Sequence, residues 1–340
     1  MKSIGSRAVF AAMSAVLSYA AVPSHVMADD FYKGRTVRVV VGSGAGGGYD
    51  TFARVLSSHW PRHIPGNPTF IVTNMPGAGS LVAANHLANV ADKDGSVIGG
   101  LNPGIVDTAI LFPAKAKHDP RKLNWIGSIL RETQLATAWH TSGVTKLDDV
   151  FKKELIVSAS GGASEIYPKF LNGLLGTKFK VVSGYKGTYE SFLALERGEA
   201  EGVAGITYAS LQATQGAALK EGKIKIIAQF GLERHPELPD VPMVMDYGKT
   251  PDDKAALNLM LARQEFGRPF AAPPAIPADR LTKLRRSFDA TMKDGQFLAD
   301  VKKRKLDVDP ITGERIQELV SKIFEVSDAT VGRVREILKK

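Results

Sequence analysis

A glycine-rich loop between an apolar run and an amphipathic segment constrains the fold of this chain most. Residues 36–41 are mostly β-branched, five glycines lie within 42–48, and 51–59 has the apolar spacing of a helix. Glycine permits positive φ angles, so successive backbone N–H groups of such a loop can point into one concavity. The helix that follows adds its unpaired first-turn N–H groups and the positive end of its dipole. We expect Asp50 to cap this helix, and the whole stretch predicts a cradle for an anion.

The same order of strand, glycine loop and helix occurs twice more along the chain. A strand predicted at 70–73 enters the loop 74–80, and a strand at 154–160 enters the loop 161–165. Strands that alternate with helices predict a parallel α/β sheet, which binds ligands at the carboxyl ends of its strands. Two such lobes would place a glycine loop on each side of one cleft.

Three helices are predicted to close the chain. The last one follows a Thr312 cap and has an apolar stripe that runs from Ile316 to Leu338. Its polar face mixes acidic and basic groups, which argues against a helix that lies on a membrane surface. We therefore expect this helix to pack on the first lobe.

The N-terminal residues have the pattern of a secretory signal peptide. Lys2 and Arg7 precede an apolar stretch at 8–22, and residues 26–28 provide a small-residue cleavage site. The apolar stretch is too short for a membrane span, so the predicted signal peptide is 1–28. The sequence contains no cysteine, so we expect neither a lipid anchor nor a disulfide. The mature protein is expected to be free in the periplasm.

Composition favours a soluble protein that attracts anions. The chain has 340 residues, of which 44% are hydrophobic and 23% charged, and this is enough for two lobes. The net charge is +9, and removal of Lys2 and Arg7 with the leader leaves 9 − 2 = +7. The lysines and arginines are scattered, with no aromatic stacking set among them, so we expect no nucleic-acid partner.

Motifs of known enzymes are incomplete in this chain. The spacing Gly42-x-Gly44-x-x-Gly47 matches the dinucleotide fingerprint, but the second strand ends in Asn74 where that fingerprint needs a carboxylate. No Gly-Lys-Ser/Thr follows the glycines, and no Gly-x-Ser-x-Gly elbow is present. His59 and a second histidine four residues later flank a proline, which disfavours a zinc helix. Binding without turnover, with no metal and no cofactor, is the simpler interpretation.

A set of ordered phrases resembles one receptor family along nearly the whole mature chain. The family is that of the periplasmic solute-binding receptors of tripartite tricarboxylate transporters, the Bug-type proteins. The phrases are Gly46-Gly47-Gly48-Tyr49-Asp50 with Ala53-Arg54, Asn74-x-Pro76-Gly77-Ala78-Gly79, Asp94-Gly95, Ser160-Gly161-Gly162-Ala163-Ser164, Tyr185-Lys186-Gly187, Leu195-Glu196-Arg197-Gly198-Glu199, Leu238-Pro239-Asp240-Val241-Pro242 and Ala272-Pro273-Pro274-Ala275-Ile276-Pro277. Their order and spacing together are specific, although each one alone is weak.

The resemblance implies a type II periplasmic-binding-protein fold. Two α/β lobes would be joined by crossover strands, with a ligand cleft between them. Applied to this chain, lobe 1 would be discontinuous, covering 29–130 and 230–340 with the C-terminal helices packed on it. Lobe 2 would cover 131–229.

The resemblance also implies a binding site on both lobes. Backbone N–H groups of the first loop would hold one carboxylate, and the second lobe would complete the site. The expected ligand-binding residues are Ser43, Gly44, Ala45, Gly46, Gly47, Tyr49, Asp50, Asn74, Ser160, Gly161, Gly162, Ala163, Ser164, Glu165, Tyr185 and Thr207. If backbone groups do the binding, replacing Ser43 by Ala should cost little, whereas Gly47→Val should block the loop.

Two departures from the family pattern bear on the ligand. Tyr49 stands where a smaller residue is frequent, and it could line the pocket, favouring a different or aromatic acid, or pack at the rim. Gly184 stands where proline is frequent. Glu165 would repel a second ligand carboxylate unless water or a cationic ligand group bridges them. The identity of the ligand stays open.

The function that follows is capture of a small organic anion by hinge closure. The anion could be a mono-, di- or tricarboxylate, including an aromatic one. The loaded receptor, expected to be a monomer, would deliver it to the large and small membrane subunits of a tripartite transporter. Two alternatives are a periplasmic sensor that presents its ligand to a membrane signalling partner, and an exported enzyme that uses the loop as an oxyanion site.

Overall fold

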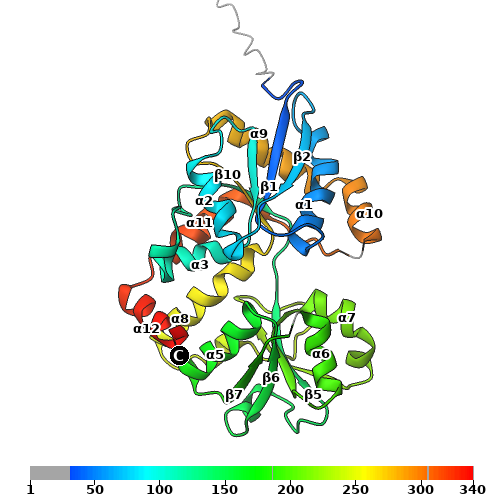
Figure 1. The fold of residues 1–340 in the computed structure, drawn as a ribbon, viewed down its shortest axis with the longest axis vertical. Helices are drawn as coiled ribbons and strands as arrows, with labels where there is room; N and C mark the ends of the chain where they lie inside the picture. Colours follow the sequence, from blue (N-terminus) through cyan, green and yellow to red (C-terminus); the bar gives the residue numbers. More distant parts are fainter. Residues whose placement is uncertain (1–30, 186, 305, 340) are drawn as a thin grey trace, which may run out of the picture.

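The computed structural model describes residues 31–185, 187–304 and 306–339. The predicted signal peptide lies outside these residues. Two β-sheets lie one above the other, and helices cover both of them (Figure 1). We call the upper sheet with its helices lobe 1 and the lower sheet with its helices lobe 2. No helix within the described ranges has the length and apolar character that a membrane crossing needs.

Lobe 1 is built on a six-stranded sheet in the order β11-β4-β10-β3-β1-β2. Its strands are β1 Thr36–Val41, β2 Thr69–Asn74, β3 Val97–Gly100, β4 Asn124–Ser128, β10 Pro269–Ala272 and β11 Ile311–Thr312. Its helices are α1 Gly48–His59, α2 Leu81–Asn89, α3 Gly104–Leu111, α9 Ala278–Met292, α10 Gly295–Lys303 and α11 Gly313–Ile323. The first three strands are parallel, as the alternation of strands and helices predicts, and β10 joins them antiparallel.

Lobe 2 is built on a five-stranded sheet in the order β7-β6-β8-β5-β9. Its strands are β5 Gln134–Trp139, β6 Leu155–Ala159, β7 Phe179–Ser183, β8 Gly202–Thr207 and β9 Ile224–Phe230. Its helices are α4 Leu147–Val150, α5 Ala163–Leu175, α6 Thr188–Glu196 and α7 Tyr208–Lys220. Strands β6, β7 and β8 are mutually parallel, while β5 runs antiparallel between β8 and β9.

Two chain segments connect the lobes. The first runs from the end of β4 to the start of β5, and the second runs from β9 back to β10 through α8 Pro251–Leu261. Helix α8 lies between the two lobes on the left of Figure 1, and the chain runs along it from lobe 2 toward lobe 1. The lobe boundaries predicted near 130 and 230 stay predictions.

The C-terminal segment is divided into two helices where the sequence predicts one. Thr312 caps α11 as expected, because its side chain accepts a hydrogen bond from the Arg315 N–H. The chain then breaks and restarts as α12 Asp328–Lys339, at whose start the Ser327 Oγ accepts from the Thr330 N–H. Within the described residues, four helices therefore follow β10 instead of the three predicted.

The two C-terminal helices differ in what they pack on. Helix α11 lies against β4 of lobe 1, but α12 packs mainly on α5 of lobe 2 and also on α8 and α3. Arg335 Nε donates to the Leu111 carbonyl at 2.7 Å, and Arg333 pairs with Asp253 at 2.7 Å. The apolar stripe therefore contacts both lobes: α11 packs on β4 of lobe 1, and α12 packs on α3 of lobe 1 as well as on α5 of lobe 2.

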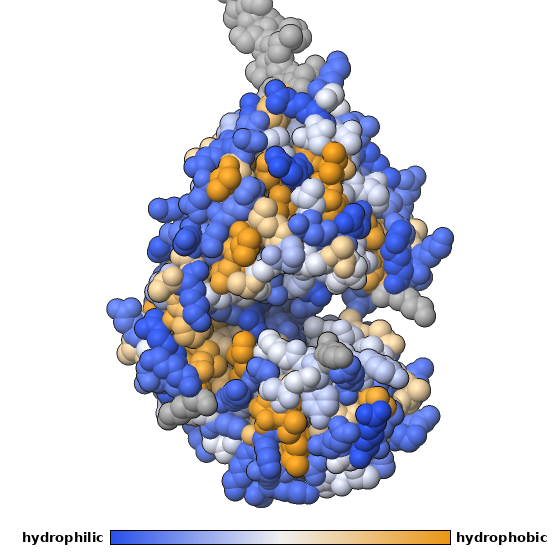
Figure 2. All heavy atoms as spheres, viewed as in Figure 1, coloured by the Kyte–Doolittle hydropathy of each residue, from blue (hydrophilic) through white to orange (hydrophobic). Residues whose placement is uncertain are grey.

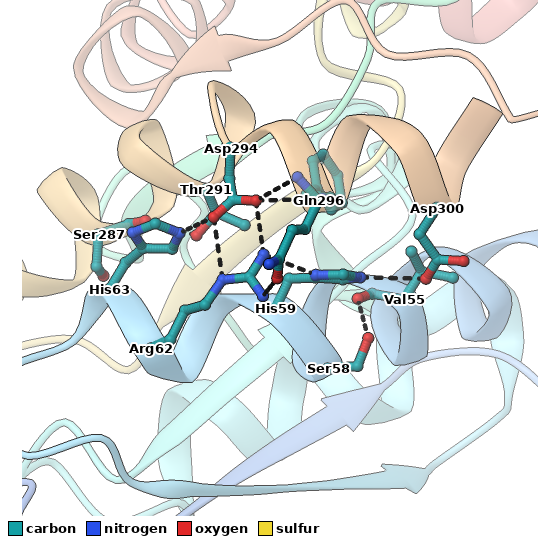
Figure 3. Close-up of polar contacts among 11 residues, drawn as sticks. Val55, Ser58, His59, Arg62, His63, Ser287, Thr291, Asp294, Gln296 and Asp300 are labelled. Carbon is teal, nitrogen blue, oxygen red and sulfur yellow. Dashed lines mark hydrogen bonds and ion pairs between the residues drawn. The ribbon is translucent and has the colours of Figure 1, made fainter. Parts of the chain in front are cut away.

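A polar cluster fixes the C-terminal end of α1 against α10 (Figure 3). Asp294 accepts from Arg62 at 2.6 and 3.0 Å and lies 2.7 Å from the His63 Nε2. His59 bridges Arg62, at 2.9 Å from its Nδ1, and Asp300, at 3.1 Å from its Nε2. The two histidines therefore hold α1 in place rather than forming a zinc helix.

Candidate ligand-binding cleft

The two lobes turn the carboxyl ends of their parallel strands toward each other. In lobe 1 these ends lead into α1, α2 and α3, and in lobe 2 they lead into α5, α6 and α7 (Figure 1). Helix N-termini with unpaired N–H groups therefore meet from both sides, which favours an anion. The surface is hollowed between the lobes (Figure 2). A cleft of about 660 Å³ lies there, with Gly48 and Arg268 of lobe 1 and Thr207 of lobe 2 in its walls.

The first glycine loop depends on two particular glycines. Gly46 has φ of +76°, a left-handed conformation that side chains with a Cβ rarely adopt. Gly42 packs against Ser80, whose Oγ donates to the Gly42 carbonyl at 2.8 Å and accepts from the Asn102 N–H at 3.0 Å. A Cβ on Gly42 would lie 2.3 Å from the Ser80 Oγ, so only glycine fits without a shift.

Gly47 is not the restricted position that the sequence suggests. Its φ is −75° and its ψ is 167°, an extended conformation open to any residue. A Cβ there would meet its nearest neighbour, the Gly44 carbonyl, at 3.4 Å. The expectation that Gly47→Val blocks the loop is therefore not supported, and the steric requirement falls on Gly42 and Gly46.

Asp50 anchors the loop from behind instead of capping the helix. Helix α1 begins at Gly48 with Gly47 as its N-cap, so the prediction of Asp50 as the cap is wrong by three residues. The Asp50 Oδ2 accepts from the Gly46 N–H at 2.9 Å and from the Arg54 Nε at 2.9 Å. The Arg54 hydrogen bond is the main reason that the pKa of Asp50 falls to about 2. A direct contact of Asp50 with the solute stays a prediction.

Asn74 joins the same anchor from the next strand. Its Nδ2 donates to the Asp50 Oδ1 at 2.8 Å and to the Ser43 carbonyl at 3.0 Å. The Asn74 amide, which stands at the end of the second strand in place of an acidic residue, therefore shapes the first glycine loop. This role explains an amide at a position where the dinucleotide fingerprint would need a carboxylate.

Tyr49 packs on a cation. The guanidinium carbon of Arg268 lies 4.3 Å from the centre of the Tyr49 ring, and Arg268 also pairs with Glu132 at 2.8 Å. Burial raises the pKa of Tyr49 to about 12, although Arg268 opposes this effect. The contact supports the alternative in which Tyr49 packs against the protein.

Two glycines and one serine fix the conformation of the glycine loop in lobe 2. Gly161 and Gly162 have φ of +93° and +59°, and α5 begins directly after them. The buried Ser164 closes the turn, since its Oγ accepts from the Ser160 N–H at 3.1 Å and donates to the Gly161 carbonyl at 2.9 Å. Gly205 allows β8 to pass close by, because a Cβ there would lie 2.6 Å from the Ala163 carbonyl.

Most of the predicted site residues lie at the edges of the cleft, outside the wall of its 660 Å³ volume. Thr207 lines the 660 Å³ volume and caps α7, where its Oγ1 accepts from the Ser210 N–H at 3.2 Å. The other predicted residues of lobe 1 and lobe 2 lie on the two facing edges, and within the described ranges none of them is in the wall of that volume. These residues are Ser43, Gly44, Ala45, Gly46, Gly47, Tyr49, Asp50, Asn74, Ser160, Gly161, Gly162, Ala163, Ser164, Glu165 and Tyr185. Their contact with a solute stays a prediction.

Sequence reasoning missed a buried charged network behind the cleft. Arg263 Nη1 donates to the Asp107 Oδ2 at 2.8 Å, and Arg263 Nε donates to the Tyr167 hydroxyl at 3.2 Å. These residues come from α3, from the segment after α8 and from α5, so the network links both lobes. Burial raises the pKa of Asp107 to about 6 against the effect of Arg263. Charged residues next to the apolar run of α8 were the signal that could have revealed it.

A second charged cluster holds the two connecting segments together. Arg131 pairs with Asp309 through two hydrogen bonds, at 2.8 and 3.1 Å, and with Glu233 at 3.1 Å. Arg131 lies on the first connection and Glu233 on the second, while Asp309 precedes β11. Any motion of one lobe against the other must act on this junction. In the part of the chain that the structure describes, no group of three or more acidic or histidine side chains could hold a metal ion.

Comparisons with known proteins agree with this geometry. Residues 53–336 match the family model described as tripartite tricarboxylate transporter family receptor, TctC. A curated relative from Cupriavidus necator, the UPF0065 protein in the gbd 5′ region, is 28% identical over 260 residues, which are 72% of this chain and 73% of the relative.

Solved structures share the fold. A TctC solute-binding protein from Polaromonas has a TM-score of 0.68 and 16% identity, over 90% of this chain and 99% of that chain. MatC from Rhodopseudomonas palustris, solved with bound malate, has a TM-score of 0.59 and 21% identity, over 89% of this chain and 99% of that chain. The family match covers most of the sequence, and the two α/β lobes confirm the periplasmic-binding-protein fold. The chain therefore belongs to the tripartite tricarboxylate transporter receptor family, the Bug-type solute-binding proteins.

Proposed function

We propose that this protein captures a small carboxylate in the periplasm by closing its two lobes. The observation that carries the proposal is the pair of facing edges, each with a glycine loop that leads into a helix N-terminus. Such an edge offers several N–H donors and a positive dipole end without a formal charge. The malate held by MatC, a relative of the same fold, is a ligand of this chemical class.

The loaded receptor would pass its solute to the large and small membrane subunits of a tripartite transporter. Family membership supports this step, because the family is defined by receptors of such transporters. We also propose export by cleavage of residues 1–28, a monomeric state and binding without turnover. The lobe boundaries near 130 and 230 would then mark the hinge at which closure occurs.

A ligand screen tests the proposal. Thermal unfolding is measured with malate, adipate, citrate and benzoate, followed by calorimetry of each acid that raises the melting temperature. At a 100-fold excess over Kd, a true ligand stabilises the folded state by about 2.7 kcal/mol. X-ray scattering should then show a smaller radius of gyration with the acid than without it. If a wide panel of carboxylates leaves the melting curve unchanged, carboxylate capture is the wrong function.

A matched pair of variants connects binding to the first loop. A Cβ at Gly44 or at Gly46 would meet no atom within 4 Å, but only Gly46 has a left-handed φ. We expect Gly46→Ala to weaken the binding of the acid found in the screen, whereas Gly44→Ala leaves it nearly unchanged. Equal affinities of the two variants would mean that the loop conformation does not carry recognition.

A further inference from the structure

A cation lies beside the helix N-terminus that forms the first anion cradle. Arg268 precedes β10, and its guanidinium carbon lies 4.3 Å from the Tyr49 ring centre and 5.6 Å from that of Phe52. A Cβ on Gly48 would lie 3.5 Å from the Arg268 Nη2. Gly48, Phe52 and Arg268 are all in the wall of the same cleft. The formal charge of the guanidinium and the positive end of α1 therefore act on the same part of the cleft.

The guanidinium keeps donors for a further partner. Its Nη1 donates to the Gly267 carbonyl at 2.9 Å, and its Nη2 pairs with the Glu132 Oε1 at 2.8 Å. The Arg268 Nε is buried and has no hydrogen-bond partner among the described residues. An arginine carries five N–H donors, and a buried donor without a partner is unfavourable. A Cβ on Gly48 would lie 3.5 Å from the Arg268 Nη2, so a carboxylate held by the first turn of α1 would lie close to this guanidinium.

Other arginines in or near the cleft wall are already engaged in joining parts of the fold. Arg234, in the wall, pairs with Asp246 at 3.5 Å and donates to the Pro239 carbonyl at 3.2 Å. Arg263 serves Asp107 and Tyr167, which lie on different lobes. Arg131 joins the two connecting segments through its acidic partners. Arg54 also lies beside the glycine loop, but it is engaged with Asp50 and Asn74. Arg268 packs on Tyr49 at the end of that loop, and the carboxylate that it contacts is a single largely buried one, Glu132.

Glu132 sets the charge that a solute meets. The Glu132 side chain is 10% exposed and lies on the first connection between the lobes. Its negative charge offsets that of Arg268, so the pair presents donors with little net charge. A solute carboxylate would have to share the guanidinium with Glu132, and the two anions would repel each other.

We propose that Arg268 binds the carboxylate of the solute together with the first-turn N–H groups of α1, and that Glu132 weakens this binding by competing for the same guanidinium. The inference rests on the proposed function, which it deepens by naming a specificity-determining side chain. It also makes the hinge sensitive to the solute, because Glu132 belongs to the segment that connects the lobes.

The direction of the change in solute affinity distinguishes this role from one in which the Arg268–Glu132 ion pair only supports the fold. Removing the Glu132 charge with Glu132→Gln leaves the guanidinium free for the solute, so affinity should rise about 10-fold for one charge-assisted hydrogen bond. In the double variant Glu132→Gln with Arg268→Gln, both charges are gone and no buried carboxylate is left unpaired. Its affinity should fall about 10- to 100-fold below that of Glu132→Gln alone. If the ion pair only supported the fold, both variants would bind the solute more weakly than the unmodified protein, since each breaks the same ion pair.

The experiment is calorimetry of the full mature chain with malate, adipate and benzoate as probes. Arg315→Gln is the control, because Arg315 is a half-exposed α11 residue that pairs with Glu318 away from the cleft. Circular dichroism and melting curves establish that each variant is folded. Arg268→Lys should restore part of the affinity lost by Arg268→Gln, since the charge is kept without the fork of donors.

Two results would overturn the inference while leaving the proposed function intact. One is weaker binding in Glu132→Gln, and the other is a double variant that binds the probes as tightly as Glu132→Gln alone. If the unmodified protein binds none of the three probes, the proposed function fails for these acids and the inference fails with it.

Discussion

The anchor beneath the first glycine loop should depend on ionised Asp50. The pKa of Asp50 falls from 3.8 to about 2, chiefly through the Arg54 hydrogen bond and also through the Gly46 N–H and Asn74. A shift of one pKa unit corresponds to about 1.36 kcal/mol, so the lowered pKa of Asp50 would add about 2.4 kcal/mol to the free energy of unfolding at neutral pH. Because Arg54 is half exposed and water screens its charge, we discount this to about 2 kcal/mol.

The variant Asp50→Asn keeps the shape of the side chain and removes its charge. A depressed pKa in the folded state adds stability above pH 4, and this stability is lost as the pH falls toward 2. We expect urea unfolding at pH 7 to show a loss of about 2 kcal/mol in Asp50→Asn. At pH 3 the loss should shrink to about half, because the unfolded state then already binds part of a proton.

An exposed ion pair of the same spacing provides the control. Asp279 pairs with Lys283 four residues along a helix at 3.6 Å and is 53% exposed. Asp279→Asn should change the free energy of unfolding by no more than about 0.5 kcal/mol at either pH. If Asp50→Asn cost the same at pH 3 as at pH 7, or cost no more than the control, the ionised anchor would be refuted.

Three further outcomes are expected. Gly42→Ala should lower the free energy of unfolding by about 1–3 kcal/mol in urea titration, because its Cβ would lie 2.3 Å from the Ser80 Oγ, whereas Gly44→Ala in open space should be nearly neutral. Asp294→Ala should lower the free energy of unfolding by about 2 kcal/mol or more, because Asp294 caps α10 at two N–H groups and also binds Arg62 and His63. A loss smaller than that of an ordinary helix cap would contradict the cluster in Figure 3. Gly173→Val should release α12, because a Cβ there would lie 2.6 Å from the Ile337 Cγ2, and hydrogen exchange confined to 328–339 should increase while both sheets stay protected.

Local patterns were sufficient for the strands and glycine loops that frame the cleft, but they placed the N-cap of α1 three residues too late. Glycines next to β-branched runs predict the loop at 42–48 correctly, since φ/ψ preference and burial act over a few residues. The identity of the glycine that needs the left-handed conformation could not be predicted. Gly46 and Gly47 are adjacent and chemically identical, and only the hydrogen bond from Gly46 to Asp50 distinguishes them.

The pairing of the charged residues at and behind the cleft could not be predicted from the sequence, because the partners are far apart along the chain. Nothing local connects Glu132 with Arg268, or Asp107 with Arg263, until two lobes bring them together. The break between α11 and α12 was missed for a related reason. The apolar stripe continues through the break, although its first half packs on β4 and its second half packs on α5, α8 and α3.

The position of α12 has a practical consequence for watching this receptor at work. Its contacts with α5, α8 and α3 place it across the junction of the lobes, on the left of the view in Figure 1, while α7 and α10 lie on the right. The natural chain contains no cysteine. One thiol could be introduced at Gly332, where an added Cβ would meet no atom within 4 Å, and one at Leu298, 40% exposed on α10, so that each would take a dye without side reactions. Energy transfer between the two dyes would then turn closure of the lobes into an optical signal, and the receptor itself into a sensor for its own solute.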